Sequence, residues 1–344
     1  MNKMSFRAVL LFVVATSMFF LEPVIPNASG ADTYEIKAVS TNRTGAQWRK
    51  WDWLAKELDK RTSGRLKMKP TVTTTELGLK GTEIIRVLKT GVIDFAEVFS
   101  SYVAGDFPLV EAPDLPGVSS SYEQSRELYK IWVEKVIAPR ENLMGGKILS
   151  TLSYNSIYVF TKFPLNSLDD LKGKKIRVFS AAMGNYVANL GMEPVSMPIG
   201  EVYVAVQKGI VDAIATGPDQ VRGMSMWEIA NNIVDLGFST AGTYIVMSGK
   251  TFDKLPADIQ KVLIDIGPEL TRLGWDLGAE NNQDGMALAK EKGMHIVVTK
   301  PEWRSRFKEI SQTKVLPKWV ANVGEEGRVA FNQFLGPAVG FQVK

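Results

Sequence analysis

The residue whose type and position point most directly to chemistry is Arg177. It lies in an apolar run, KIRVF at 175–179, that alternates like a β-strand and places Arg177 on the face opposite Ile176 and Val178. A guanidinium that is enclosed by protein needs an anionic partner, and its planar fork fits a carboxylate with two hydrogen bonds. Two interpretations are open: Arg177 pairs with an Asp or Glu of the protein, or it binds the carboxylate of a ligand.

Most side chains that carry enzyme chemistry are scarce in this chain. It has one histidine, His295, and no cysteine, which argues against Ser-His-Asp triads and leaves Cys-His pairs and common zinc sites without their residues. His295 begins an apolar strand, and we interpret it as structural. No phosphate-binding glycine loop occurs, and no Asp/Glu pair stands out as in a glycosidase. We therefore expect no cofactor, no metal and no enzymatic activity, with an exported carboxylate enzyme as the weakest alternative.

The N-terminus has the pattern of an export signal. Lys3 and Arg7 precede an apolar run at 8–21, and Ser29-Gly30-Ala31 offers small residues for cleavage before Asp32. The apolar run is shorter than the ~20 residues that span a bilayer. We expect 1–31 to be a signal peptide and the mature protein to be soluble in the periplasm. The formal net charge of +4 is too small to indicate nucleic acid as a partner.

The elements that must position Arg177 follow from a repeat. Residues 83–94 and 201–212 both begin with Glu, continue as an amphipathic run to a glycine, and end with two β-branched residues and an Asp. Around each copy the periodicity predicts the order β-α-β-α-β. Such units form α/β lobes with mostly parallel sheets covered by helices. Two similar lobes predict a cleft between them.

The segments between and after the repeats are predicted to connect the two lobes, as hinge strands and as a long helix that contacts both. Residues 149–162 and 241–248 read as long strands that cross between the lobes. Gly267-Pro268 should break the helical C-terminal third into a short helix and a long one of about 22 residues that braces both lobes. We expect surface helices at 301–319 and 325–334. The expected boundaries are 32–155 with 244–284 for lobe I, 156–243 with 285–330 for lobe II, and a tail at 331–344.

Ligands of open α/β sheets lie beyond the carboxyl ends of the strands. This rule selects four segments that are rich in hydroxyl, small or aromatic residues: 41–43, 99–101, 179–181 and 216–218. Their composition suits a small polar ligand with an apolar body. The aromatic residues Trp48 and Tyr158 could also line such a pocket.

The stretch around Arg177 closely resembles a known family. Residues 168–178 (LDDLKGKKIRV) are followed by LGMEPV at 190–195 and by the second repeat, and the first lobe agrees at Leu77-Gly78 and Asp114-Leu115-Pro116. This pattern, over roughly 33–320, is similar to that of the DctP-type solute receptors of tripartite ATP-independent periplasmic (TRAP) transporters. The resemblance implies a two-lobed periplasmic-binding-protein fold of class II type. It also implies a receptor that captures a small organic acid and delivers it to a membrane permease.

The resemblance also implies site residues. The arginine at the position of Arg177 binds the ligand carboxylate in this family. Combined with the strand-end rule, the predicted ligand-binding residues are Arg177, Phe179, Ser180, Ile199, Thr216, Tyr158, Asn42, Trp48, Phe99 and Ser100. Receptors for ABC importers or sensor kinases share the fold and are the alternative function.

The sequence departs from the family pattern at a second position. Some sialic-acid and dicarboxylate receptors carry a second arginine after a Tyr-Asn-Gly-Thr-like run, whereas this chain has Tyr158 there, after Tyr154-Asn155-Ser156-Ile157. An Asn that is often found near Thr216 is also missing. These differences favour a monocarboxylate with an apolar or aromatic body over a dicarboxylate.

Overall fold

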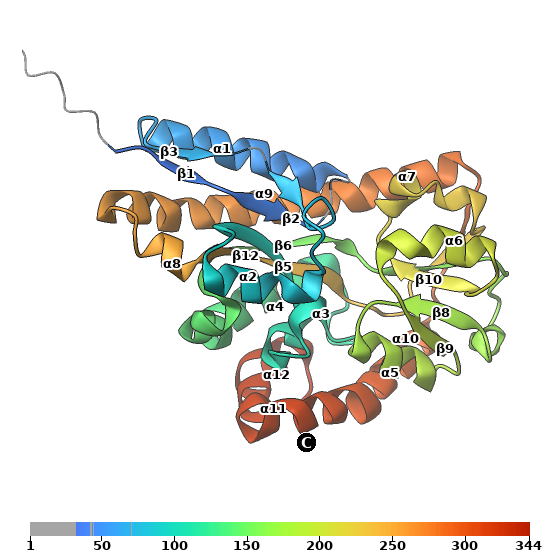
Figure 1. Ribbon diagram of the computed structural model, residues 1–344. Coiled ribbons are helices and arrows are strands. Elements are labelled where there is room, and N and C mark those ends of the chain that lie inside the picture. Colours follow the sequence, from blue (N-terminus) through green and yellow to red (C-terminus); the bar gives the residue numbers. More distant parts are fainter. Residues whose placement is uncertain (1–31, 42, 44, 70) are drawn as a thin grey trace, which may run out of the picture. The chain divides into compact units, whose positions relative to one another are not determined.

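The computed structural model describes residues 32–41, 43, 45–69 and 71–344 (Figure 1). Residues 33–344 form one compact unit. The expected signal peptide, 1–31, and the predicted site residue Asn42 lie outside the described residues. Within the described part of the chain, no helix is long and apolar enough to cross a membrane.

A five-stranded sheet forms the core of the first lobe. Its order is β4 (Val72–Thr73), β2 (Ala38–Ser40), β5 (Phe95–Phe99), β12 (Thr240–Ser248) and β6 (Gly146–Ser156). Strand β2 is parallel to β4 and β5, whereas β12 is antiparallel to β5 and β6. Two short parallel strands, β1 (Tyr34–Ile36) and β3 (Leu66–Met68), lie beside it.

A six-stranded sheet forms the second lobe. Its order is β13 (His295–Val297), β11 (Asn232–Val234), β7 (Tyr158–Thr161), β10 (Ala213–Thr216), β8 (Lys175–Val178) and β9 (Glu193–Ser196). Strand β7 is antiparallel to β10 and β11, and the remaining pairs are parallel. The predicted two-lobed α/β fold is confirmed. The sheets are mixed because β12 runs antiparallel to β5 and β6, and β7 runs antiparallel to β10 and β11, whereas the strands of the β-α-β units pair in parallel.

Helices cover both sheets. In chain order they are α1 (Arg49–Arg61), α2 (Ile84–Thr90), α3 (Ser100–Val103), α4 (Tyr122–Trp132), α5 (Ala181–Asn189), α6 (Val202–Gln207), α7 (Gln220–Gly223), α8 (Gly249–Phe252), α9 (Ala257–Glu291), α10 (Pro301–Ile310), α11 (Leu316–Ala330) and α12 (Gly336–Val339). Their buried faces follow the apolar periodicity: in α1, for example, Trp51, Leu54 and Leu58 are buried.

The two copies of the repeat have the same structural role. The carboxylate of Asp94 accepts a hydrogen bond from the backbone N–H of Lys37 at 2.8 Å, and that of Asp212 accepts one from Lys175 at 2.9 Å. Each Asp therefore ties the start of its own strand to the neighbouring parallel strand. The repeat builds the scaffold of each lobe.

The predicted break at Gly267-Pro268 is wrong, because α9 runs unbroken for 35 residues with Pro268 inside it. Proline removes one backbone donor, but the helix continues through this point, where it packs closely on β6. A Cβ on Gly267 would lie 2.2 Å from the carbonyl oxygen of Leu149, and one on Gly278 would lie 2.1 Å from that of Ser153. The helix is about 52 Å long and contacts β6 of the first lobe and α7 of the second.

The predicted lobe boundaries fall within three segments that connect the lobes. The positions 155/156, 243/244 and 284/285 lie inside β6, β12 and α9, respectively. The exact boundaries stay a prediction.

Candidate ligand-binding site

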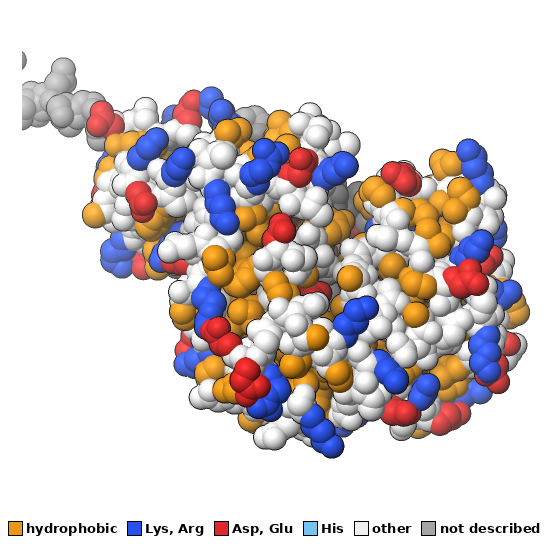
Figure 2. Space-filling model, turned by 60° about the horizontal axis from the view of Figure 1, so that its bottom comes forward, with side chains coloured by type: hydrophobic (Ala, Val, Ile, Leu, Met, Phe, Trp, Pro, Cys, Tyr) orange, Lys and Arg blue, Asp and Glu red, His pale blue; other side chains and the backbone are white. Residues whose placement is uncertain are grey.

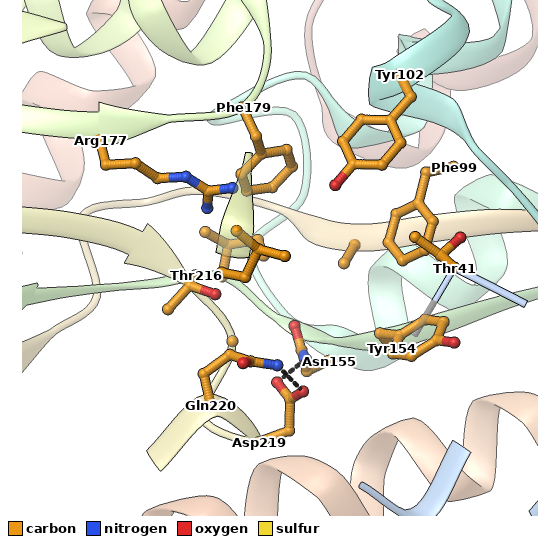
Figure 3. A pocket seen from close by; sticks show the side chains of 14 residues that line it. Thr41, Phe99, Tyr102, Tyr154, Asn155, Arg177, Phe179, Thr216, Asp219 and Gln220 are labelled. Atoms are coloured by element: carbon orange, nitrogen blue, oxygen red, sulfur yellow. Dashed lines mark hydrogen bonds between the residues drawn. The ribbon is translucent and has the colours of Figure 1, made fainter. Parts of the chain in front are cut away.

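A cavity of about 80 Å³ lies where the two sheets meet (Figure 3). The first lobe, with the strands β6 and β12 that connect the lobes, contributes Thr41, Phe99, Tyr102, Tyr154, Asn155, Ile157 and Ala241. The second lobe contributes Arg177, Phe179, Ile199, Thr216, Gly217, Asp219 and Gln220. As the strand-end rule predicts, several of these residues end strands or follow them directly, such as Phe99 on β5 and Thr216 on β10.

Arg177 is the cation of this cavity. It lies on strand β8 and is buried, at 2 % exposure. Its Nε donates a hydrogen bond to the carbonyl oxygen of Met197 at 3.1 Å, and its Nη1 donates one to that of Ala215 at 2.9 Å. Burial lowers the pKa of Arg177 to about 10, and the one titratable neighbour that contributes to this pKa is Tyr102, not a carboxylate. Internal pairing with an Asp or Glu, one of the two interpretations open from the sequence, is not found among the described residues. The guanidinium is held by two carbonyl oxygens, and the described part of the chain supplies no counter-ion for it.

Aromatic rings line the cavity on two sides. The Arg177 guanidinium lies 5.0 Å from the ring centroid of Phe179, in cation–π contact. Across the cavity, the ring centroid of Phe99 lies 5.4 Å from that of Tyr102 and 5.0 Å from that of Tyr154. These rings offer flat apolar surfaces to the body of a ligand.

A polar cluster forms another side of the cavity (Figure 3). Asp219 accepts hydrogen bonds from Asn155 Nδ2 at 2.5 Å and from Gln220 Nε2 at 2.6 Å. Asn155 comes from the end of β6 in the first lobe, whereas Asp219 and Gln220 follow β10 in the second. The cluster therefore joins the two lobes at the cavity.

A buried ion pair supports the first-lobe side. Lys50 of α1 pairs with Glu97 of β5, and both side chains have 0 % exposure. The second carboxylate oxygen of Glu97 accepts from Thr41 N at 2.9 Å and Tyr154 OH at 2.8 Å. Because Thr41 and Tyr154 both line the cavity, the ion pair holds two of its walls.

Five of the ten predicted residues line the cavity: Arg177, Phe179, Ile199, Thr216 and Phe99. Asn42 lies outside the described residues. The other four, Ser180, Ser100, Trp48 and Tyr158, are not among the lining residues.

The four have other contacts. Ser180 caps α5 by accepting a hydrogen bond from Met183 N at 3.1 Å, and Ser100 donates to the carboxylate of Asp114. The ring of Trp48 packs under the guanidinium of Arg43, 4.5 Å from its centroid.

Tyr158 lines a separate, serine-rich cavity of about 220 Å³. Ile157, which links β6 to β7, lines both cavities, whereas Tyr158 lines only the serine-rich one of the two.

Sequence reasoning missed several lining residues. Tyr102 could have been found from its position one helical turn after Phe99, and Asp219 from its position directly after the strand-end segment 216–218. Tyr154 and Asn155 lie in the run compared with the family's Tyr-Asn-Gly-Thr-like pattern, which was the signal that could have found them. Their local sequence gave none, since both lie inside a long strand whose irregular pairing with β12 decides which side chains face the cavity.

Among the described residues, no group of three or more His, Cys, Asp or Glu side chains could hold a metal ion. On the face in Figure 2, basic and acidic side chains are interspersed over the surface, without a large patch of one sign.

Comparisons with known proteins identify the family of this chain. Residues 40–319 match the family model described as bacterial extracellular solute-binding protein, family 7 (DctP). A solute-binding protein of Sulfitobacter sp. strain NAS-14.1 is 28% identical over 258 residues, which cover 72% of this chain and 76% of that protein.

Solved structures share the fold. The extracytoplasmic solute receptor DctP7 of Bordetella pertussis, which binds pyroglutamic acid, has a TM-score of 0.80 at 23% identity and covers 90% of this chain and 100% of its own. A TRAP periplasmic solute-binding protein of Desulfovibrio salexigens with bound orotic acid has a TM-score of 0.81 at 19% identity, with 90% and 99% covered. With its family model matched over most of its length, the chain belongs to family 7 of the bacterial extracellular solute-binding proteins, as its resemblance to TRAP solute receptors predicted.

Proposed function

We propose that this protein is a periplasmic receptor of a TRAP transporter that captures a small organic acid through the acid's carboxylate at Arg177. The observation that carries the proposal is a buried guanidinium at a cavity, fixed by two carbonyl oxygens and without a carboxylate partner among the described residues. A buried charge without a partner costs free energy, which a bound carboxylate would recover through charge-assisted hydrogen bonds.

The lining favours a monocarboxylate with a flat body. Arg177 is the one cationic side chain among the lining residues, and Asp219 is an acidic one, so a second carboxylate would meet repulsion rather than a partner. The aromatic rings of Phe99, Tyr102 and Phe179, which line the cavity, suit a ligand with a planar ring. Pyroglutamic and orotic acids, which two structural neighbours bind, are both ring monocarboxylates.

Closure and delivery complete the proposal. A ligand that contacts Arg177 in one lobe and Phe99 in the other binds more tightly when the lobes are closed, so it shifts the population towards the closed state. The closed receptor then delivers the acid to the membrane permease. Permease genes of the TRAP type beside this gene would support delivery, and genes for an ATP-driven importer there would contradict it.

The test is a thermal-shift screen of mono- and dicarboxylates on the exported protein, followed by calorimetry with the acid that gives the largest shift. Arg177→Met should weaken that acid at least about a hundredfold, because the carboxylate loses its charged donor. Arg126→Met, which removes an exposed arginine paired with Asp276, is the matched control and should leave affinity unchanged. Equal affinity of the Arg177→Met variant and the unaltered protein would refute the proposal.

A further inference from the structure

We infer that the ligand must bring a hydrogen-bond donor, an N–H or O–H group, to Asn155, in addition to its carboxylate at Arg177. This inference rests on the proposed function and narrows its ligand class. It rests on three observations: an acceptor without a partner, the residue that orients it, and the close packing that holds it.

The acceptor is the amide oxygen of Asn155. The side chain is buried, at 4 % exposure, and Oδ1 has no hydrogen-bond partner among the described residues. Figure 3 shows this oxygen directed into the cavity, away from Asp219. Buried polar atoms in folded proteins normally have a partner, so an unpaired one at a cavity indicates a group that arrives with the ligand.

Asp219 decides which end of the amide faces the cavity. Its Oδ1 accepts from Asn155 Nδ2 at 2.5 Å, and its Oδ2 accepts from Gln220 Nε2 at 2.6 Å. An ionised carboxylate only accepts hydrogen bonds. If the Asn155 amide turned over, its oxygen would meet the carboxylate oxygen, so Asp219 positions Oδ1 towards the ligand.

Gly217 holds the amide in place. A Cβ at this residue would lie 2.1 Å from Asn155 Cγ and Nδ2, which is too close for any side chain. The amide therefore packs directly on the backbone that follows β10. Its position and its orientation are both fixed before a ligand binds, as selective recognition requires.

The two fixed groups define the ligand class. Arg177 requires an anionic acceptor, and Asn155 Oδ1 requires a donor. Small acids with a ring N–H or with a hydroxyl group meet both requirements. Ethers, esters and dicarboxylates that place an oxygen lone pair at Asn155 do not, because they leave its oxygen unpaired and add repulsion.

The test uses matched pairs of acids that differ in the donor alone. Pyrrole-2-carboxylate and furan-2-carboxylate exchange an N–H for an oxygen in the same flat ring, and 3-hydroxybenzoate and 3-fluorobenzoate exchange a hydroxyl for a fluorine. Calorimetry on the exported protein should show the donor acid binding at least about tenfold tighter in one pair or both. Ratios below about threefold in both pairs, or no binding by any of the four acids, would overturn the inference.

A variant separates orientation from shape. Asp219→Asn keeps the shape but can donate as well as accept, so the Asn155 amide can turn over and the preference for the donor acid should fall to about threefold or less. The control Asp276→Asn removes one exposed carboxylate outside the cavity and should keep the full preference. An unchanged preference in Asp219→Asn would also overturn the inference.

The Arg177→Met variant distinguishes this inference from the proposed function. If it abolishes binding of both acids of a pair while the unaltered protein does not discriminate between them, the carboxylate site stands and the donor requirement fails. If it binds both acids as the unaltered protein does, the proposed function itself fails.

Discussion

Among the described residues, each lobe buries one cation, Lys50 behind the cavity wall and Arg177 in it, and the two have opposite kinds of partner. In the first lobe, Lys50 pairs with Glu97, donates to the carbonyl oxygen of Gln47 at 3.0 Å, and lies 5.1 Å from the ring centroid of Tyr154. In the second lobe, Arg177 donates to two carbonyl oxygens and pairs with no carboxylate of the described chain.

The difference separates a charge that has an internal counter-ion from one that has none among the described residues. Burial lowers the pKa of Lys50, although the neighbouring Glu97 raises it in part, and burial lowers the pKa of Arg177 to about 10. The Lys50–Glu97 pair satisfies both charges inside the protein, so it fixes Thr41 and Tyr154 without a ligand. Arg177 has no such partner among the described residues, so under the proposed function it is the second lobe that supplies the charge for a bound anion.

The largest expected effect is on the internal pair. Lys50→Met leaves Glu97 buried without its cation, and we expect the free energy of unfolding to fall by about 3–5 kcal/mol in urea denaturation. Lys261→Met, which removes an exposed lysine paired with Asp265, should cost less than about 1 kcal/mol.

Two further outcomes bear on that pair. The double variant Lys50→Met/Glu97→Gln should recover much of the loss, since it removes the unpaired carboxylate as well. A single Lys50→Met variant as stable as the unaltered protein would show that this pair is not the structural half of the comparison.

Glu111 is a buried acid of the first lobe whose protonation should affect stability. Burial, and then the neighbouring Asp114, raise the pKa of Glu111 to about 7 from its ordinary 4.5. The folded protein therefore binds a proton that the unfolded chain releases, so the contribution to stability is full below about pH 4.5 and is lost as the pH rises through 7.

Glu111→Gln removes this titration. Between pH 5 and pH 8 the unaltered protein should lose up to about 3 kcal/mol of unfolding free energy relative to the variant, measured by urea denaturation at each pH. Glu302→Gln, an exposed acid on α10, is the control and should follow the unaltered protein. If the unfolding free energies of Glu111→Gln and the unaltered protein changed in parallel with pH, Glu111 would not be the group that takes up the proton.

A smaller effect is expected for the stability of the Arg177→Met variant without ligand. The variant loses two hydrogen bonds but also removes a buried charge without a partner, and these changes oppose each other. We expect the free energy of unfolding to change by no more than about 1 kcal/mol, against the larger loss for Lys50→Met. Destabilisation as large as that of Lys50→Met would make Arg177 a structural cation and remove the contrast between the lobes.

The smallest effect on ligand affinity is expected at Tyr158. By the resemblance to TRAP receptors, this is the position at which some family members carry a second arginine. Tyr158 lines the separate serine-rich cavity, so Tyr158→Phe should change the affinity for the best acid by less than about twofold in calorimetry. Thr216→Val, at a residue that lines the ligand cavity, provides the comparison and should weaken binding more. A loss of tenfold or more in Tyr158→Phe would place this residue in the binding site after all.

Much of the fold was predictable because it depends on local patterns. The repeat at 83–94 and 201–212 predicted two lobes, and each copy ends with an Asp that makes the same hydrogen bond to the neighbouring strand. The unbroken helix α9 was not predictable, because close packing of Gly267 and Gly278 on β6 outweighs the local effect of Pro268.

The sequence alone determined that Arg177 lies on a buried strand of an α/β lobe, where its charge needs a partner, because strand alternation and strand ends are local properties. Only the tertiary structure decided which buried cation has an internal partner. Glu97 reaches Lys50 and not Arg177 because the sheet and α1 bring them together across 47 positions of chain. Tertiary contacts also bring the Asn155 amide to Asp219, which accepts a hydrogen bond from its Nδ2. This contact leaves Oδ1 of Asn155 as the atom that faces the cavity.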